Sequence, residues 1–317
     1  MARRQVSQSS IVRIGARGSR LSLIQAGQMQ RAIAAALGVA PEEAEAVVPI
    51  VIITTTGDRV QDRRLLEIGG KALFTKEIEE ALIEGRVDCA VHSMKDVPAE
   101  RQPGLVIAAV PEREDVRDAF ICLNHDDIAS LPQGARLGTA SLRRQAQCLH
   151  LRPDLEPVLM RGNVDTRLAK LADGAADAMI LALSGLKRMG LQDHARSLID
   201  PIDAPPAPGQ GALAVETRAA DADSVWAKAL NHAPSALTVT AERGALEALE
   251  GSCRTAMGAY ARIDGHRLTL VVEALTPDGS QRFRRHGECP AKPEDARRLG
   301  RELGEAVKAD GGDRLVL

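Results

Sequence analysis

The stretch VDCAVHSMKDVP, residues 87–98, decides how the fold of this chain is interpreted. It opens with a short apolar run behind Gly85, which favours a strand buried on both faces of a sheet. Pro98 stops any regular continuation, and four polar residues stand before it: His92, Ser93, Lys95 and Asp96. Because the carboxyl ends of such strands open into a crevice in α/β sheets, this cluster predicts a functional site there. The alternative is an ordinary turn that exposes polar side chains.

The composition indicates a globular protein of two or three domains. The chain has 317 residues, of which 44% are hydrophobic and 26% are charged. Aromatic residues make up only 2%, so few rings are present on which the bases of a single-stranded nucleic acid would stack. The net charge of −2 provides no overall attraction to DNA or to an anionic membrane. We therefore expect neither nucleic acid nor a membrane as a partner.

Targeting and metal signals point to the cytoplasm and to no metal site. The first ten residues are partly basic but lack the apolar segment of a secretory signal, and no run of about 18 apolar residues occurs. The cysteines are odd in number, widely spaced and without a Cys-x-x-Cys pair: Cys89, Cys122, Cys148, Cys253 and Cys289. Free thiols in this pattern fit a reducing compartment and argue against a cysteine zinc site.

The first part of the chain alternates strand and helix signals. Ser19 is a good N-cap for a helix that runs to about Leu37. Apolar residues between Phe74 and Leu82 share one face of a second helix, which ends at Gly85. We expect strands at residues 11–14, 47–53, 87–91 and 105–110.

The same series of elements begins again after a charged segment at residues 111–117, a candidate linker. The sequence RLGTAS at residues 136–141 is similar to RIGARGS at residues 13–19: each has a strand, a glycine and a serine that starts a helix. Later turns and strands of the two parts also correspond, although their offsets differ. We infer two similar α/β lobes with a cleft between them, a common location for small-molecule sites.

The remainder of the chain predicts a small third domain. A stiff, proline-rich segment at residues 200–211 crosses to it, followed by one more strand at residues 213–216. A helix at residues 238–249 then precedes three strands at hairpin spacing and a closing amphipathic helix. The strands are expected at residues 258–263, 267–274 and 281–286.

Arginines gather at the expected strand–helix junctions of both lobes: Arg17, Arg143, Arg144, Arg161 and Arg167. Helix N-termini already attract anions through their free N–H groups, and guanidinium groups add bidentate carboxylate or phosphate contacts. A single arginine of this kind is usually a surface charge. Five in matching positions indicate a ligand with several negative charges.

Three further features carry possible chemistry. Asp96 at the strand end is placed to stabilise a cation or to move a proton, or it forms a surface ion pair with Lys95. Cys253 stands beside an arginine that favours the thiolate, although most free cysteines are small buried apolar residues. The sequence Gly209-Gln210-Gly211 is either a hinge or a close approach of the backbone, and it is not a phosphate loop.

Six motifs taken together resemble the porphobilinogen deaminase family, also called the hydroxymethylbilane synthase family. They are GGKALF at residues 69–74, AVHSMKDVP at 90–98, GTASLRRQ at 138–145, LMRGNV at 159–164, GQGA at 209–212 and LEGSC at 249–253. They stand in the family's order. The HSMKD run and the SLRR run are very specific to the family.

The resemblance implies an α/β chain of three domains, the first two folded like periplasmic solute-binding proteins. The first domain would comprise residues 1–112 and 209–230, the second residues 113–208, and the third, an α+β domain with a three-stranded antiparallel sheet, residues 231–317. The implied enzyme is a transferase that deaminates four porphobilinogen molecules and joins them head to tail into hydroxymethylbilane, releasing ammonia. It extends a dipyrromethane cofactor, covalently linked through a thioether to the cysteine that matches Cys253.

The resemblance also assigns site residues. Asp96 matches the family's catalytic carboxylate, which would stabilise the cation formed when ammonia leaves and help remove a proton afterwards. The positions that match substrate- and cofactor-binding residues are Arg17, Ser19, Lys71, Phe74, Lys95, Thr139, Ser141, Arg143, Arg144, Arg161, Asn163, Arg167 and Arg188. We expect a cytoplasmic monomer whose partner is the small molecule porphobilinogen.

The chain departs from the family pattern at four small residues. Ala72, Ala140, Ser252 and Ala256 stand where the family often has Gly, Ser, Gly and Pro. None of these changes removes a charge or the thiol, so the enzyme assignment is kept. The rival hypothesis is a two-lobed anion-binding protein without catalysis, which explains the arginines but neither Cys253 nor the third domain.

Overall fold

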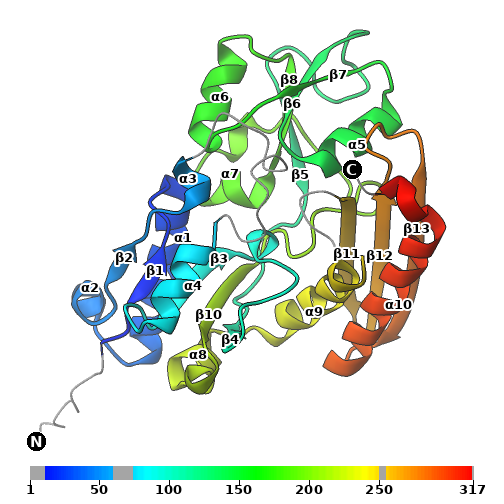
Figure 1. Cartoon of the computed structure of the whole chain (residues 1–317). Coiled ribbons are helices and arrows are strands. Elements are labelled where there is room, and N and C mark those ends of the chain that lie inside the picture. Colours follow the sequence, from blue (N-terminus) through cyan, green and yellow to red (C-terminus); the bar gives the residue numbers. More distant parts are fainter. Residues whose placement is uncertain (1–10, 60–73, 250–254, 316–317) are drawn as a thin grey trace, which may run out of the picture.

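The computed structural model describes residues 11–59, 74–249 and 255–315. Within these residues, the strands form two five-stranded sheets and one three-stranded sheet (Figure 1). Lys71 and Cys253 lie outside the described residues, as do Ala72 and Ser252. No helix in the described part of the chain is long and apolar enough to cross a membrane.

The sheet of the first lobe has the order β2-β1-β3-β10-β4. Its strands are β1 (Ile14–Ala16), β2 (Ile50–Ile52), β3 (Cys89–Ser93), β4 (Leu105–Ala109) and β10 (Leu213–Arg218). β1 runs parallel to β2 and β3, whereas β10 runs antiparallel to β3 and β4. The chain therefore returns from far along the sequence to insert one strand beside the one that precedes the HSMKD turn.

The sheet of the second lobe repeats this arrangement in the order β7-β6-β8-β5-β9. Its strands are β5 (Asp118–Cys122), β6 (Arg136–Thr139), β7 (Glu156–Leu159), β8 (Ala178–Ala182) and β9 (Ser197–Leu198). β6 runs parallel to β7 and β8, and β5 is the antiparallel neighbour of β8. The prediction of two similar α/β lobes is confirmed.

Helices connect and cover these strands (Figure 1). In α1, which begins after Ser19, Ile33 and Met29 pack against Ile14 of the sheet, as expected for an amphipathic helix on a parallel sheet. The helices of the first lobe are α1 (Arg20–Ala36), α2 (Ala44–Val47), α3 (Thr56–Arg59), α4 (Lys76–Ile83) and α8 (Val225–Leu230). Those of the second lobe are α5 (Leu142–Leu151), α6 (Val164–Ala172) and α7 (Leu183–Met189).

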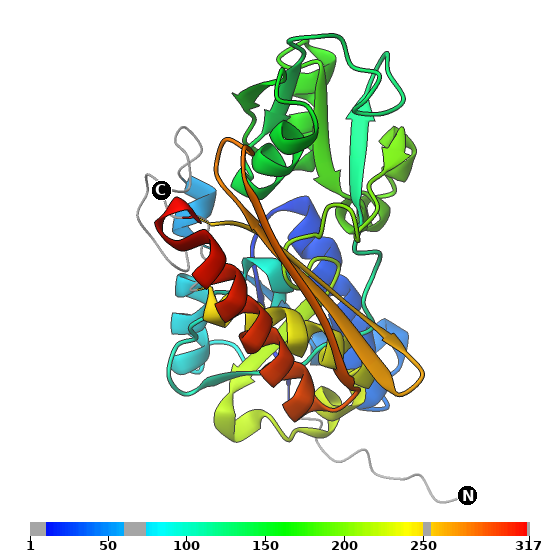
Figure 2. The ribbon, with the colours of Figure 1, turned by 90° about the vertical axis from the view of Figure 1, so that its right-hand side faces the viewer.

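The third domain is an antiparallel sheet covered by two helices. Its strands are β11 (Ala256–Asp264), β12 (Arg267–Leu275) and β13 (Arg282–Pro290), and its helices are α9 (Ala233–Ala248) and α10 (Pro293–Gly311). Figure 2 shows α10 running alongside the twisted ribbon of these strands. The two helices approach closely because Gly300 has no Cβ, which would overlap with the carbonyl of Ala241.

Several expected element bounds were wrong for local reasons. The expected strand at residues 47–53 begins only at Ile50, because Val48 still donates its N–H to Ala44 at the end of α2. The helix expected from residue 238 begins at Ala233, since Pro234 fits the first turn, where no N–H partner is needed.

The two segments that cross between the lobes, the charged one and the proline-rich one, are packed against the third domain. Arg113 donates from both terminal nitrogens to the carboxylate of Glu242 at 2.8 Å, and the Glu242 side chain is fully buried. The same carboxylate accepts from the N–H groups of Gly209 and Ala261. Both crossing segments are therefore held by a buried ion pair and by hydrogen-bonded backbone groups.

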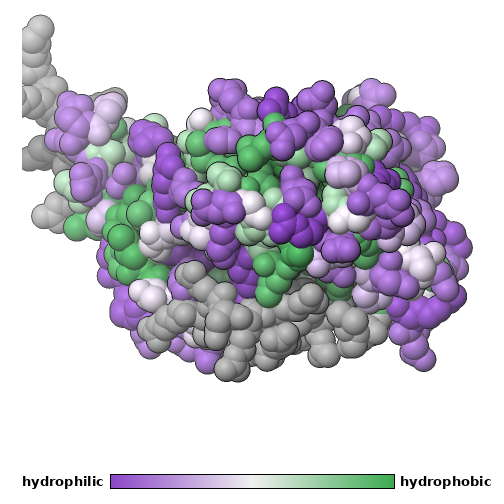
Figure 3. Space-filling model, turned by 90° about the horizontal axis from the view of Figure 1, so that it is seen from above, coloured by the Kyte–Doolittle hydropathy of each residue, from purple (hydrophilic) through white to green (hydrophobic). Residues whose placement is uncertain are grey.

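The outer surface seen from above the second lobe is mostly hydrophilic, with small apolar areas between the polar groups (Figure 3). Among the exposed leucines, Leu151 ends α5, Leu198 ends β9 and Leu123 follows β5. Isolated apolar residues of this kind are usual on a globular surface.

Candidate active site

A cleft of about 1610 Å3 lies between the two lobes and reaches the edge of the third domain. Its walls bring together nearly all described residues that the sequence analysis selected. They are Arg17, Ser19, Phe74, Lys95, Asp96, Thr139, Ser141, Arg143, Arg144, Arg161, Asn163, Arg167 and Arg188. The cleft that the paired lobes predicted is therefore present, and the HSMKD and SLRR motifs face each other across it.

The HSMKD motif ends β3 and continues as a single 3-10 turn, Met94–Asp96. Met94 is buried and anchors this turn, whereas Lys95 and Asp96 are exposed to the cleft. Arg243 of the third domain donates to the carbonyls of Val97 and Pro98 at 3.1 and 2.6 Å. The backbone that carries Asp96 is therefore fixed by buried Met94 before it and by the contacts of Arg243 after it.

Three of the selected polar residues are helix N-caps. The side chain of Ser19 accepts from Ser22 N, that of Ser141 accepts from Arg144 N, and that of Asn163 accepts from Thr166 N. Each cap satisfies one of the free N–H groups of its helix and leaves the others at the cleft. The N-termini of α1, α5 and α6 therefore all contribute positive potential to one space.

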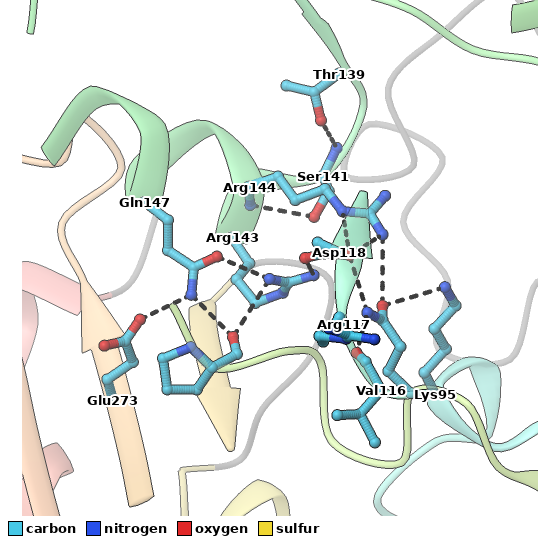
Figure 4. Close-up of polar contacts among 12 residues, drawn as sticks. Lys95, Val116, Arg117, Asp118, Thr139, Ser141, Arg143, Arg144, Gln147 and Glu273 are labelled. Atoms are coloured by element: carbon cyan, nitrogen blue, oxygen red, sulfur yellow. Dashed lines mark hydrogen bonds and ion pairs between the residues drawn. The ribbon is translucent and has the colours of Figure 1, made fainter. Parts of the chain in front are cut away.

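Arg143 and Arg144 share a buried carboxylate that the sequence analysis missed. Asp118 lies 2.8 Å from Nη2 of Arg143 and 2.7 Å from Nη2 of Arg144 (Figure 4). Burial alone would raise the pKa of Asp118, but the two guanidinium groups outweigh it and hold that pKa far below its usual range. Asp118 is thus the internal counterion of two residues expected to bind ligand carboxylates.

Arg143 is the more enclosed of this pair. Its Nη1 donates to Oε1 of Gln147 at 2.7 Å, and Gln147 in turn donates to Glu273 of the third domain at 2.7 Å (Figure 4). Arg143 also contacts the carbonyl of Pro205. Protein groups therefore take up much of its hydrogen-bonding capacity.

Cations crowd the wall that α6 and α7 form. Burial, with repulsion from Arg144 and Arg161, lowers the pKa of Arg167 to about 10, while the charge of Asp96 acts in the opposite direction. Burial also lowers the pKa of Arg188, whose Nη2 donates to the carbonyl of Gly211 at 2.7 Å. This wall would be stabilised by an anionic ligand.

Lys95 is in the same field. Its side chain faces the cleft, where desolvation by the surrounding protein and then the charge of Arg144 lower its pKa to about 8. The negative charges of Asp96 and Asp118 act in the opposite direction. Its Nζ lies 3.5 Å from Oε1 of Gln210. Lys95 therefore begins to lose its proton only slightly above neutral pH.

Arg17 has a different environment from the other arginines. Its Nε donates to Asp58 at 3.0 Å, and its guanidinium lies 4.1 Å from the centroid of the Phe74 ring. Asp58 was not selected from the sequence, although it follows a Thr-rich turn after β2, in the short helix α3, and a carboxylate close behind a strand is a signal of the same kind as Asp96. Arg17 is thus oriented by a carboxylate and an aromatic ring together.

Two expected site residues, Lys71 and Cys253, lie outside the described residues. The chain on either side of residues 250–254 reaches the cleft, because Leu246, Glu247, Thr255 and Met257 line it. Ala256, where the family often has Pro, is fully buried in strand β11 beside Leu275.

The fold and the cleft define a class: a two-lobed α/β protein with a cleft lined by cationic side chains and an added α+β domain. The chain belongs to the porphobilinogen deaminase family. The family model described as "Porphobilinogen deaminase, dipyromethane cofactor binding domain" matches residues 12–225, and the one for the C-terminal domain matches residues 236–309.

Curated relatives carry the same name. Porphobilinogen deaminase from Phenylobacterium zucineum is 65% identical over 97% of this chain and 98% of its own length. That from Caulobacter sp. (strain K31) is 63% identical over 96% of this chain and 98% of its own length. Among solved structures, a methionine-bound nutrient-binding protein from Burkholderia cenocepacia has 17% identity and a TM-score of 0.44, over 69% of this chain and 90% of that protein.

Proposed function

We infer that this protein has the activity of its family: it deaminates porphobilinogen and joins four molecules head to tail into hydroxymethylbilane, with release of ammonia. The observation that carries this conclusion is the cleft itself, where Asp96 from one lobe faces the cations of the other. Binding of an anion alone needs the cations but not a carboxylate among them. The comparisons likewise favour the enzyme over a simple anion-binding protein.

The cations would bind the substrate through its carboxylates. Each pyrrole carries an acetate and a propionate, so every added ring brings two negative charges into the cleft. Arginine forks match carboxylates in geometry as well as in charge. The main candidates are Arg144, Arg161, Arg167 and Lys95, whereas Arg188 also donates to the carbonyl of Gly211 and Arg17 is oriented by Asp58.

The residues fit a covalently attached dipyrromethane. Its four carboxylates suit the crowded cations around Arg167, and the residues that flank position 253 line the same cleft. When bound, the group supplies the terminal pyrrole to which the first substrate is joined. We propose that Cys253 holds it through a thioether, while Ser19, Lys71, Phe74, Thr139, Ser141, Arg143 and Asn163 help to bind it or the substrate.

Asp96 would act on the substrate. Loss of ammonia needs a proton on the leaving amine and leaves positive charge on the pyrrole methylene and ring nitrogen. A carboxylate fixed beside the ring N–H stabilises that charge as it develops. After the new carbon–carbon bond forms, the same carboxylate can receive the proton that the attacked ring must lose. The packed 3-10 turn keeps Asp96 in place for both steps.

The organisation of the chain is part of this proposal. Strand pairing supports a first domain of residues 1–112 and 209–230, a second of residues 113–208 and a third of residues 231–317, since β10 joins the first sheet. Asp96 then belongs to the first domain, the arginine pair to the second and Cys253 to the third. We expect a monomer in the cytoplasm that binds no nucleic acid.

Intact-protein mass spectrometry with a product assay tests the function. The wild-type protein should be heavier than its sequence by a dipyrromethane and should convert porphobilinogen to hydroxymethylbilane. Cys253→Ser should lose both the added mass and the activity, because a hydroxyl is a far poorer nucleophile than a thiolate. Cys289→Ser, a buried cysteine of the same domain, is the matched control and should keep both. A wild-type protein that has its sequence mass and forms no product would contradict the proposed function and favour a simple anion-binding protein.

A further inference from the structure

The tripeptide Gly209-Gln210-Gly211 makes a close backbone approach. Gly209 and Gly211 have φ values of 75° and 89°, in the left-handed region that favours glycine. A Cβ on Gly209 would overlap with the side chain of Met94, and one on Gly211 with the carbonyl of Glu114. The two glycines thus confine Gln210, whose side chain is fully buried, to one position.

The side-chain amide of Gln210 joins groups from both lobes. Its Nε2 donates to Oδ1 of Asp118 at 2.9 Å and to the carbonyl of Val116 at 2.8 Å. Its Oε1 faces Nζ of Lys95 at 3.5 Å and Nη2 of Arg144 at 3.4 Å (Figure 4). One amide therefore connects the turn that carries Asp96 to the first turn of α5.

Asp118 completes this connection at the start of β5. Its carboxylate binds Arg143, Arg144 and Gln210 at once and is only 4% exposed. The hydrogen bonds that Arg144 makes with Asp118 and Gln210 use Nε and Nη2. Among the described residues no hydrogen bond uses Nη1 of Arg144, so this group is the one available to a ligand.

We propose that Asp118 and Gln210 are positioning residues of the anion site. They hold Arg144 and Lys95 in one arrangement across the two lobes, so that both cations reach the same substrate carboxylate. The inference rests on the proposed function, because it concerns how the substrate of that reaction is bound. Neither residue needs to touch the substrate itself.

The charge of Asp118 has a second effect, on Lys95. Desolvation is the main cause that lowers the pKa of Lys95 to about 8, the charges of Arg144 and Arg143 act in the same direction, and those of Asp96 and Asp118 oppose them. Removing the Asp118 charge shifts this balance toward the uncharged amine. Lys95 would then lose its proton at a lower pH and would bind a carboxylate less well. A purely structural role of Asp118 predicts no such shift.

The test compares Asp118→Asn, Gln210→Leu and the control Asp126→Asn, an exposed carboxylate of the same lobe. Intact mass first shows whether each protein carries its covalent pyrroles. Then kcat and KM for porphobilinogen are measured from about pH 6.5 to 9.5. In the wild type, KM should begin to rise near the pKa of Lys95, about 8.

Asp118→Asn should raise KM at least tenfold at pH 7 and move the onset of its alkaline rise down by about one pH unit. Gln210→Leu keeps every charge, so it should raise KM by a similar factor without that shift. Asp126→Asn should behave as the wild type. If Asp118→Asn does not fold, Gln210→Leu alone decides, and an unchanged KM there overturns the inference. An active wild type with unaltered KM profiles in both variants overturns it too, whereas an inactive wild type rejects the proposed function instead.

Discussion

Arg13 binds Asp88 through three hydrogen bonds, one from its backbone N–H and two from its guanidinium, at 2.8 to 2.9 Å. In the second lobe Arg136 binds Asp177 through the same three groups, at 2.7 to 3.3 Å. Arg13 directly precedes β1 and Arg136 begins β6, the corresponding strand of the second lobe, and each binds the carboxylate just before the neighbouring strand, β3 or β8. The lobes are therefore alike in this ion pair as well as in strand order.

Asp88→Asn should lower the free energy of unfolding by about 1 kcal/mol, the net value of a typical partly buried hydrogen-bonded pair. Asp177→Asn should have the smaller effect, because its side chain is 40% exposed and that of Asp88 only 23%. Chemical denaturation at pH 7 measures both changes. An equal or larger loss for Asp177→Asn would contradict this ranking.

The Asp88 effect should depend on pH. Burial alone would raise the pKa of Asp88, but hydrogen bonds and charge from Arg13 outweigh it and lower the pKa below its ordinary value. A carboxyl with a lowered folded-state pKa stabilises the protein above its unfolded pKa of about 3.9 and loses this contribution as the pH falls further. The difference between wild type and Asp88→Asn should shrink below about pH 4. A constant difference down to pH 3 would argue against the ion pair as its cause.

Arg167→Gln should weaken the binding of substrate and increase the thermal stability of the cofactor-free protein. Arg167 lies in a partly desolvated site near Arg144 and Arg161, so the protein that lacks its covalent pyrroles, as in a Cys253→Ser background, should become more heat-stable when that charge is removed. Loss of one charge-assisted contact should raise KM about ten- to a hundredfold. Arg31→Gln, an exposed arginine on α1, serves as the control for net charge. A destabilised Arg167→Gln protein with normal KM would reverse the assignment.

Asp96→Asn should abolish rapid turnover without loss of the fold. The amide keeps the size of the side chain but not its charge, and one such electrostatic contribution is worth about 2.7–4 kcal/mol, or about a hundred- to a thousandfold in rate. The variant, supplied with preassembled tetrapyrrole, should still carry covalent dipyrromethane by intact mass. Single-turnover ammonia release measures the chemical step. A rate within tenfold of the wild type would remove Asp96 from the mechanism.

Glu242→Gln should be among the most destabilising single changes. Its carboxylate accepts from Arg113 and from two backbone N–H groups, and breaking a buried ion pair costs about 3–5 kcal/mol. Glu305→Gln, an exposed residue of α10, should change stability by less than about 0.5 kcal/mol. Thermal denaturation of the two variants compares them. Similar melting temperatures would show that the junction contributes little.

The sequence alone was sufficient for the architecture and for most of the cleft. Strand ends, N-caps and arginines are local features, so residues such as Ser141, Arg144 and Asp96 are recognisable from their neighbours in the chain. Element bounds were less predictable, as at residues 47–53, because an apolar run suits a buried helix end as well as a strand.

Only the tertiary structure identified Asp118, Gln210 and Glu242 as the groups that hold the cleft together. Each is an ordinary polar residue in its own stretch of sequence, and each acts on cations and N–H groups that lie far away along the chain. The chain crosses between the lobes twice, and only this double crossing brings Asp118 and Gln210 between Lys95 and Arg144. The sequence thus determines which charges are present, whereas the fold decides which of them neutralise one another, because electrostatic and hydrogen-bond energies depend on distance in space.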